Sequence, residues 1–278
     1  MRTTAGLVRP ATGSIMYAAS ATIDSVDIYS ISGLTLTQTG SITDGIHGPR
    51  DVFVTTNHTL YVLNNATITE YPNGQSSPTE RIITPVVGGD MTVGPDGTIF
   101  VCGRIKGTGR NAVAEFDPGA VQPSRLIKYR TTIPYPIGCS GMATDSKGNL
   151  YVNVGSEGDG GGYSIEVYPP KHVKPDRYLY SGNNYTNGGM EIIGTRLIDS
   201  DYQDGVTFIT DLSGRKHHTI PDPSSAGGGL VIDPTTDYLY LDGGDENSLA
   251  IYDLPSGKLL ATFPTFNYGG IAIDPPAY

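Results

Sequence analysis

Apolar and polar residues alternate along most of the chain in short runs, and the runs recur in a fixed order. Each copy starts with glycine or another small or polar residue before an apolar triplet, turns through Asp or Gly, and continues into an apolar–Tyr–apolar segment. The clearest copies read GDMTVGPDGTIFVCG from Gly89, SGMATDSKGNLYVNV from Ser140 and GGLVIDPTTDYLYLDG from Gly228. Period-two alternation with many β-branched and aromatic residues predicts β-strands joined by tight turns.

The repeat occurs six times, at a spacing that suits one propeller blade. The equivalent apolar residue of each copy, called the reference residue below, is Val52, Met91, Met142, Met190, Leu230 or Ile271. Successive reference residues are 39 to 51 positions apart, and a four-stranded blade takes about 40 to 50 residues. The repeat length therefore indicates a propeller with six blades.

Further alternating segments supply the outer strands. Third strands are predicted at 24–31, 66–72, 112–118, 164–170, 205–211 and 248–254, and more polar fourth strands at 79–84, 124–130, 176–181, 215–220 and 258–263. The last copy, 268–278, contains only an innermost strand, whereas 14–42 contains only three outer strands. One blade should therefore combine both ends of the chain and close the ring.

The sequence thus predicts an all-β fold, a six-bladed β-propeller with four antiparallel strands per blade. We expect one domain over residues 1–278, with residues 1–13 as an N-terminal extension and the C-terminal innermost strand joined to the N-terminal blade.

Two segments, GTIFV from Gly97 and DSKGNLYV from Asp145, resemble the NHL and YVTN type of six-bladed propellers. The stretch from Ile68 to Thr84, with its Tyr-Pro-Asn-Gly turn, resembles the strand-and-linker pattern of bacterial secreted members. The resemblance covers nearly the whole chain from Ser14. It implies architecture rather than activity, because such propellers include ligand-binding rings, lyases and calcium-dependent lactonases.

Composition narrows the choice of partners and compartment. With 37 Gly, 20 Pro and 17% charged residues, the chain is unsuited to a coiled coil or a helical bundle. A net charge of −10 disfavours nucleic acid and anionic membranes, and no apolar run approaches the ~20 residues of a membrane span. Acidity, few Lys and loop-rich composition favour an extracellular or periplasmic protein, although the first ten residues contain no apolar signal-peptide core.

The two cysteines, Cys102 and Cys139, fall at the same end of neighbouring blades. They could form a disulfide or remain two buried thiols, and the sequence leaves both readings open.

In a propeller of this type the innermost strands begin on one face, which also carries the loops between second and third strands. We call it the mouth face and expect the functional site there. Candidate binding residues at the predicted strand starts are Arg50, Ser140, Asn187 and Tyr268. Glycines at these starts either open the mouth and expose backbone amides, or allow six crowded strands to converge.

Asp51 and Asp90 occupy equivalent positions on neighbouring blades, and two such carboxylates could bind a hard cation or share a proton. Asn187 could add an amide oxygen to a calcium site, and His47 could act as a general base beside Asp51 and Asp90. Alternatively, Asp51 pairs with Arg50 or caps a loop. Gly48–Asp51 is a loose echo of gluconolactonase and regucalcin-like propellers, which bind metal through carboxylate and Asn oxygens at the channel mouth.

A basic, glycine-rich loop over 103–110 offers Arg104 as a contact for an anionic ligand. We expect a monomeric, exported, non-enzymatic propeller that binds a small molecule, a glycan or a protein on its mouth face. The alternative is a calcium-dependent, lactonase-like hydrolase or lyase with catalytic residues His47, Asp51 and Asp90.

Overall fold

The computed structural model describes residues 13–73, 75–129, 136–156, 164–179, 189–201, 205–221, 229–243, 248–264, 266 and 268–276. Within these ranges the regular structure consists of β-strands, with no helix. Consequently, no helix of the described residues is long and apolar enough to cross a membrane.

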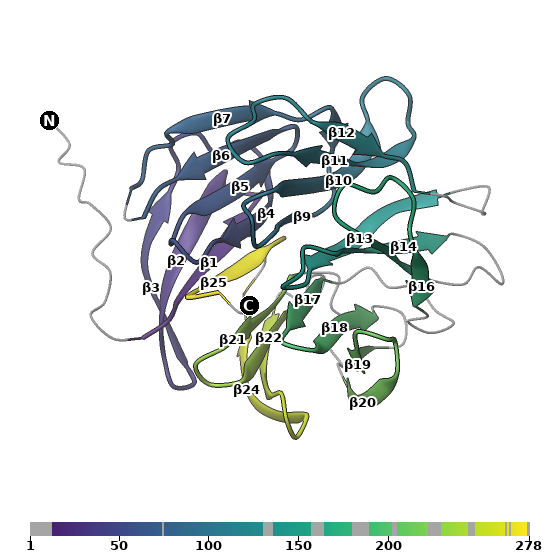
Figure 1. Cartoon of the computed structure of the whole chain (residues 1–278). Coiled ribbons are helices and arrows are strands. Elements are labelled where there is room, and N and C mark those ends of the chain that lie inside the picture. The colour runs from purple at the N-terminus through teal and green to yellow at the C-terminus, as the bar shows by residue number, and fades with distance from the viewer. Residues whose placement is uncertain are drawn as a thin grey trace, which may run out of the picture.

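The strands form six sheets, and each sheet is one blade of a propeller (Figure 1). Their strands, from the axis outward, are: blade 1, β25 (Ile271–Asp274), β1 (Ile15–Ser20), β2 (Ser25–Ser32), β3 (Thr35–Ile42); blade 2, β4 (Pro49–Val54), β5 (Leu60–Asn64), β6 (Thr67–Tyr71), β7 (Glu80–Ile83); blade 3, β8 (Val86–Val87) and β9 (Met91–Val93), β10 (Ile99–Ile105), β11 (Asn111–Phe116), β12 (Arg125–Ile127); blade 4, β13 (Pro136–Thr144), β14 (Leu150–Ser156), β15 (Ser164–Tyr168), β16 (Arg177–Leu179); blade 5, β17 (Met190–Ile193), β18 (Arg196–Asp201), β19 (Val206–Asp211), β20 (Lys216–Pro221); blade 6, β21 (Leu230–Asp233), β22 (Tyr238–Asp242), β23 (Ser248–Asp253), β24 (Lys258–Pro264). The predicted six-bladed fold is confirmed.

Blade 1 closes the ring as the sequence predicts. Strand β25 pairs antiparallel with β1, with Ile271 opposite Ala18 and Asp274 opposite Ile15. The pairing continues past the strand, because Ala19 and Gly269 exchange backbone hydrogen bonds of 2.8 and 2.9 Å with the opposite chain end. The innermost strands contact one another in the order β4, β9, β13, β17, β21, β25 and back to β4.

The core is divided among the six interfaces between blades. Six buried hydrophobic clusters are present, and each draws its residues from two neighbouring blades. Strand β1 shows the reason: Tyr17 and Ala19 pack toward blade 2, whereas Met16 and Ala18 pack toward blade 6. Since successive side chains of a strand point to opposite faces, a blade between two others buries both of its faces.

Blade 3 departs from the predicted four strands. Its innermost position is split into β8 and β9, which both pair with β10. Gly88 and Gly89, both with positive φ, break the strand between them. A Cβ on Gly89 would lie 2.2 Å from the carbonyl oxygen of Cys102, so the break needs glycine.

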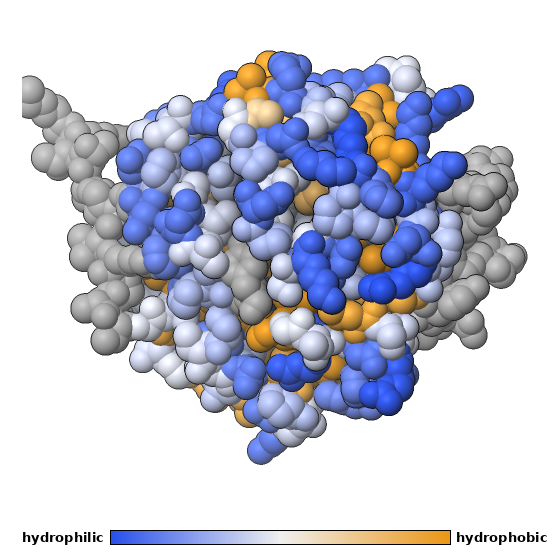
Figure 2. All heavy atoms as spheres, in the orientation of Figure 1, coloured by the Kyte–Doolittle hydropathy of each residue, from blue (hydrophilic) through white to orange (hydrophobic). Residues whose placement is uncertain are grey.

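The surface visible in Figure 2 is mostly hydrophilic, with small, separated hydrophobic areas. The most exposed large hydrophobic residues, Ile23 and Ile83, belong to different blades. Scattered exposure of this kind is normal for a folded protein.

Cys102 and Cys139 form a disulfide between blades 3 and 4, which settles the alternative left open by the sequence. Their Cα atoms are 5.9 Å apart and both residues are buried. No free cysteine remains in the chain.

Removing this disulfide should destabilise the protein. The bridge closes a loop of 37 residues, and in the chain-entropy model a loop of that size contributes about 4 kcal/mol. The double variant Cys102→Ala/Cys139→Ala should therefore unfold at lower urea concentration than the oxidised wild type. Thiol titration of the unfolded, unreduced wild type provides the control, and one or two reactive thiols there would contradict the bridge.

Candidate functional site

The candidate carboxylates lie where one innermost strand meets the next. Reference residues such as Val52 and Met91 pack toward the preceding blade. Side chains one position before or after them consequently point toward the following blade. The position just before the reference residue is held by Asp51, Asp90, Gly141, Gly189, Gly229 and Gly270.

Asp51 and Asp90 connect blades 2, 3 and 4 through backbone amides. The carboxylate of Asp51 accepts hydrogen bonds from the N–H of Val52 and from the N–H of Met91, both at 2.8 Å. Asp90 accepts from the same Met91 N–H at 2.9 Å and from Met142 N–H at 2.5 Å. Each carboxylate therefore satisfies a backbone donor of the next blade.

The two carboxyl groups also interact with each other. Burial, followed by the negative charge of Asp90, raises the pKa of Asp51 well above its usual range. Burial likewise raises the pKa of Asp90, and the hydrogen bond with Asp51 offsets part of that rise. Two close carboxyls of this kind hold one proton between them, because two adjacent negative charges would repel.

Glycine replaces the carboxylates farther round the ring, where the innermost strands approach more closely. A Cβ on Gly189 or Gly229 would lie 2.8 Å from the backbone nitrogen of the next reference residue. A Cβ on Gly270 would lie 2.2 Å from Asp51 Oδ1. Crowding, rather than an open mouth, explains these three glycines.

A third carboxyl, Glu191, has the same role in blade 5. It follows the reference residue Met190, and its Oε2 accepts the N–H of Ile232 in blade 6 at 2.6 Å. Burial raises the pKa of Glu191 to about 8. Sequence reasoning missed this residue, although an acidic residue inside an apolar innermost strand is a visible signal.

The remaining predicted residues near Asp51 do not join it. His47 is exposed, and its backbone N–H donates to Asn64 Oδ1 at 2.9 Å. Arg50 is also exposed and donates through Nε to Asn65 Oδ1 at 3.1 Å, so the alternative of an Asp51–Arg50 pair is not what forms.

Tyr268 belongs to a polar and aromatic cluster between blades 6 and 1. Its hydroxyl donates to Asp27 Oδ2 at 2.7 Å and lies 2.6 Å from the hydroxyl of Tyr29. The ring of Phe266 packs 4.4 Å away, centroid to centroid. Burial, then the bond to Asp27, raises the pKa of the Tyr268 hydroxyl, so this group stabilises the ring closure as a neutral donor.

The predicted calcium set is only partly described. Asp51 and Asp90 are brought together, Asn187 lies outside the described residues, and the side chain of Ser140 is likewise outside them although its backbone belongs to β13. Over the described ranges, no group of three or more His, Cys, Asp and Glu is placed to hold a metal ion.

A cleft of about 440 Å³ lies on the face opposite the mouth, between blades 3 and 4. Turns of both blades form its walls, through Pro95, Asp96, Lys147 and Lys171, and Phe100 and Glu115 also line it. Sequence reasoning did not single out this cleft, because it arises from turns that are distant in the sequence.

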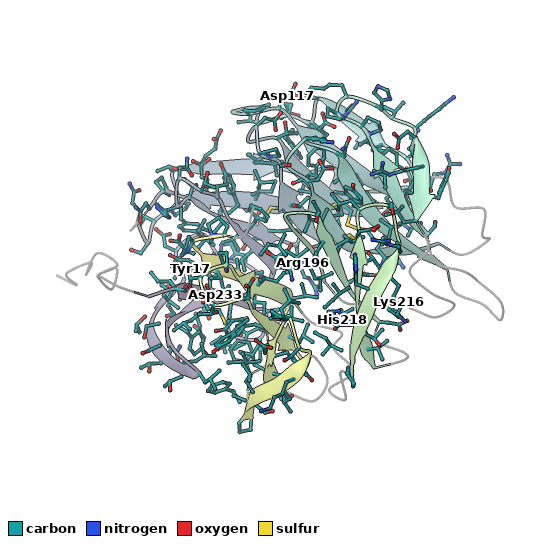
Figure 3. All side chains as sticks on the ribbon, turned by 60° about the horizontal axis from the view of Figure 1, so that its bottom comes forward. Tyr17, Asp117, Arg196, Lys216, His218 and Asp233 are labelled. Carbon is teal, nitrogen blue, oxygen red and sulfur yellow. A yellow bond between two sulfur atoms is a disulfide. The ribbon has the colours of Figure 1, made fainter. Side chains whose placement is uncertain are left out.

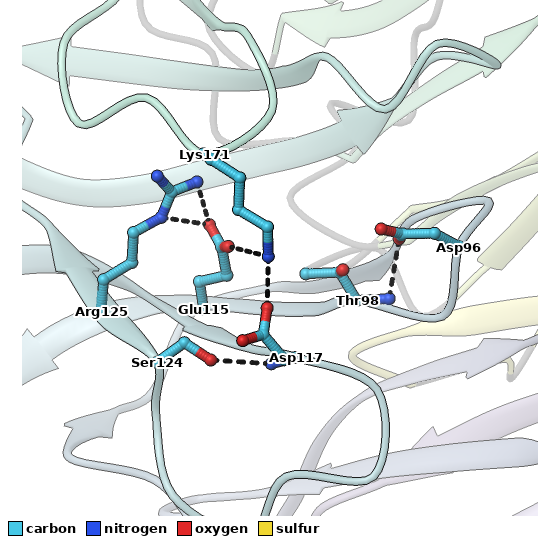
Figure 4. A network of polar contacts seen from close by, with 7 residues as sticks. All are labelled: Asp96, Thr98, Glu115, Asp117, Ser124, Arg125 and Lys171. Carbon is cyan, nitrogen blue, oxygen red and sulfur yellow. Dashed lines mark hydrogen bonds and ion pairs between the residues drawn. The ribbon is translucent and has the colours of Figure 1, made fainter.

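Glu115 is the centre of an ion network in this cleft (Figure 4). It is 1% exposed and accepts Arg125 Nε at 2.6 Å, while Lys171 Nζ lies 3.5 Å from its other oxygen. Lys171 also pairs with Asp117, and the Asp117 N–H donates to Ser124 Oγ at 3.1 Å. Since the charges neutralise one another, the cleft has no strong preference for either sign.

Comparison with known proteins adds the fold and nothing finer. No family model matches the chain, and no curated protein sequence matches it. Among solved structures it is similar to hydrazine synthase of Kuenenia stuttgartiensis, with 15% identity, a TM-score of 0.61, and coverage of 91% of this chain and 87% of that one. It is also similar to a chain of a nidogen/laminin complex, with 17% identity, a TM-score of 0.65, and coverage of 94% and 98%.

The carboxyl groups between the blades should make stability depend on pH. Glu191 has a pKa of about 8 in the folded protein and about 4.3 when unfolded. Its stabilising contribution is complete below pH 4.3 and is lost as pH rises through 8, amounting to on the order of 3 kcal/mol. Urea unfolding from pH 4.5 to 9 should therefore show a smaller loss for Glu191→Gln than for the wild type.

Asp237→Asn is the matched control, because Asp237 is an exposed acid and asparagine tolerates its positive φ. This variant should retain the wild-type pH profile. Equal pH dependence of Glu191→Gln and the wild type would contradict the role assigned to Glu191.

The Glu115 network should stabilise the joint between blades 3 and 4. Glu115→Gln removes the charge that holds partly buried Arg125 and should lower the free energy of unfolding by about 2 kcal/mol. Asp117→Asn, at an exposed position, should change it far less. Urea denaturation of both variants checks this, and equal effects would argue against Glu115 as the centre of the network.

Proposed function

We propose that this protein is a binding propeller that works outside the cytoplasm and engages its ligand or partner on the mouth face. The observation that supports binding over catalysis is the use made of Asp51 and Asp90. Both spend their oxygens on backbone amides of neighbouring blades, and the Asp51–Asp90 pair keeps a proton. Groups with that duty are structural parts of the ring.

The difference between the two faces supports the choice of the mouth. Turns on the opposite face repeat one chemistry, in which an aspartate accepts backbone N–H groups of the turn, as Asp145, Asp211 and Asp233 do. On the mouth face, His47, Arg50 and Arg104 are exposed. A scaffold with uniform turns on one side and varied polar side chains on the other is typical of a recognition surface.

The disulfide supports export. Disulfides form and persist in oxidising compartments and are rare in the cytosol. Both cysteines of the chain are used in the single bridge between blades 3 and 4.

The alternative, a calcium-dependent lactonase-like hydrolase, is favoured by one observation. Asp51 and Asp90 lie close enough to share the N–H of Met91, so a hard cation could replace their proton. Such a cation would be displaced at low pH, since it competes with protonation.

Thermal melting separates the two functions. We expect the melting temperature to be the same in calcium and in EDTA, no hydrolysis of aliphatic or sugar lactones, and binders on glycan and peptide arrays. Calcium at 100 times its Kd would instead add about 2.7 kcal/mol. A calcium shift lost in Asp51→Asn but kept in Asp237→Asn, together with lactone turnover, would replace binding by the hydrolase.

A further inference from the structure

The charge of the chain is unevenly distributed. Residues 104–177, which cover most of blades 3 and 4, hold ten of the 18 Lys and Arg but only seven of the 28 Asp and Glu. Eight basic and 21 acidic residues are left for the other blades. A protein of net charge −10 therefore contains one sector with an excess of positive charge.

Most acids of this sector are already engaged inside it. Glu115 and Asp117 neutralise Arg125 and Lys171. Glu166 is buried against the hydroxyl of Tyr168, and burial raises its pKa. These acids cannot neutralise the basic side chains on the mouth face of the sector.

The basic hairpin, defined as residues 104–110 between β10 and β11, carries three of those side chains. Arg104, Lys106 and Arg110 are all exposed, and none forms an ion pair with any described residue. Basic residues elsewhere do have partners: Arg196 pairs with Asp237, and Lys216 lies over the ring of Phe208. Figure 3 shows Arg196 and Lys216 well apart from Asp117 of blade 3.

The hairpin is held in a defined position. Strand β8 pairs with β10 at Arg104 and Ile105, and Lys106 N–H donates to Pro85 O at 3.0 Å. A Cβ on Gly103 would lie 2.1 Å from the oxygen of Gly88, so the strands are in close contact at the hairpin's base. The disulfide at Cys102 anchors the same strand to blade 4. Little conformational entropy would therefore be lost when the hairpin binds a ligand.

We propose that the basic hairpin is the docking site for an acidic extracellular polysaccharide, whose carboxylate or sulfate groups bind Arg104, Lys106 and Arg110. This inference rests on the proposed function and specifies its ligand. A polysaccharide suits a short, protruding hairpin, whereas a folded protein partner needs an interface of about 1,000 Å² or more. Nucleic acid suits the compartment poorly, and its dense phosphates meet a strongly negative protein.

The binding of heparin measures this directly. We expect the wild type to bind heparin at 50 mM NaCl and to weaken steeply by 200 mM, as contacts to a polyanion do. The variant Arg104→Gln/Lys106→Gln/Arg110→Gln should bind at least tenfold more weakly, with a shallower salt dependence. The control Arg81→Gln/Arg215→Gln/Lys258→Gln removes equal charge from blades 2, 5 and 6 and should bind like the wild type.

Polygalacturonate, neutral dextran and a single-stranded oligonucleotide complete the design. Binding of heparin or polygalacturonate but not dextran supports the proposal. Equal losses in the two triple variants, no binding of either acidic polysaccharide, or tighter binding of the oligonucleotide would overturn it. If the hairpin variant still binds another array ligand, this inference fails while the binding function stands; calcium-dependent lactone turnover would defeat that function itself.

Discussion

The close convergence of six innermost strands is the constraint on which this structure depends. Each strand brings backbone N–H groups toward a neighbouring blade, where no ladder partner is available to them. Two solutions occur at the position before the reference residue: glycine lets the backbones approach, as at Gly229, and aspartate accepts the neighbour's N–H, as at Asp51. Both solutions follow from the cost of an unsatisfied buried amide.

That constraint changes the meaning of the acidic pair at the centre. Carboxylates on neighbouring blades are a reasonable signature of a metal or catalytic site, and Asp51 and Asp90 do lie together. Their oxygens face Met91 and Met142, however, rather than only the opening of the channel. A proton shared between them lowers the repulsion that two charges would cause, so the pair can join three blades without a cation.

The fold could be predicted from the sequence because its determinants are local and repeated. Period-two alternation defined the strands, the spacing of reference residues defined the blades, and the incomplete first and last copies defined the closure between β25 and β1. The site was harder, since the roles of Asp51 and Glu191 depend on which neighbouring blade their side chains face. The disulfide could not be decided either, because it depends on the register that brings two Cα atoms to 5.9 Å. The split of β8 and β9 likewise required the contact of Gly89 with Cys102, which no local pattern reveals.

The closed ring also explains how recognition and stability can be separated in one small domain. Hydrophobic contacts between blades, carboxyl–amide bonds near the axis and one disulfide provide stability, and none of them needs the exposed side chains of the mouth face. The basic hairpin illustrates this division, because its strands are fixed at the base by Gly103 and Cys102 while its three cations remain without acidic partners in the described structure. In an otherwise acidic protein, such a sector orients the approach of an anionic ligand, since the other blades repel it. The mouth face can therefore vary its ligand chemistry through loop residues alone, while the contacts between blades preserve the ring.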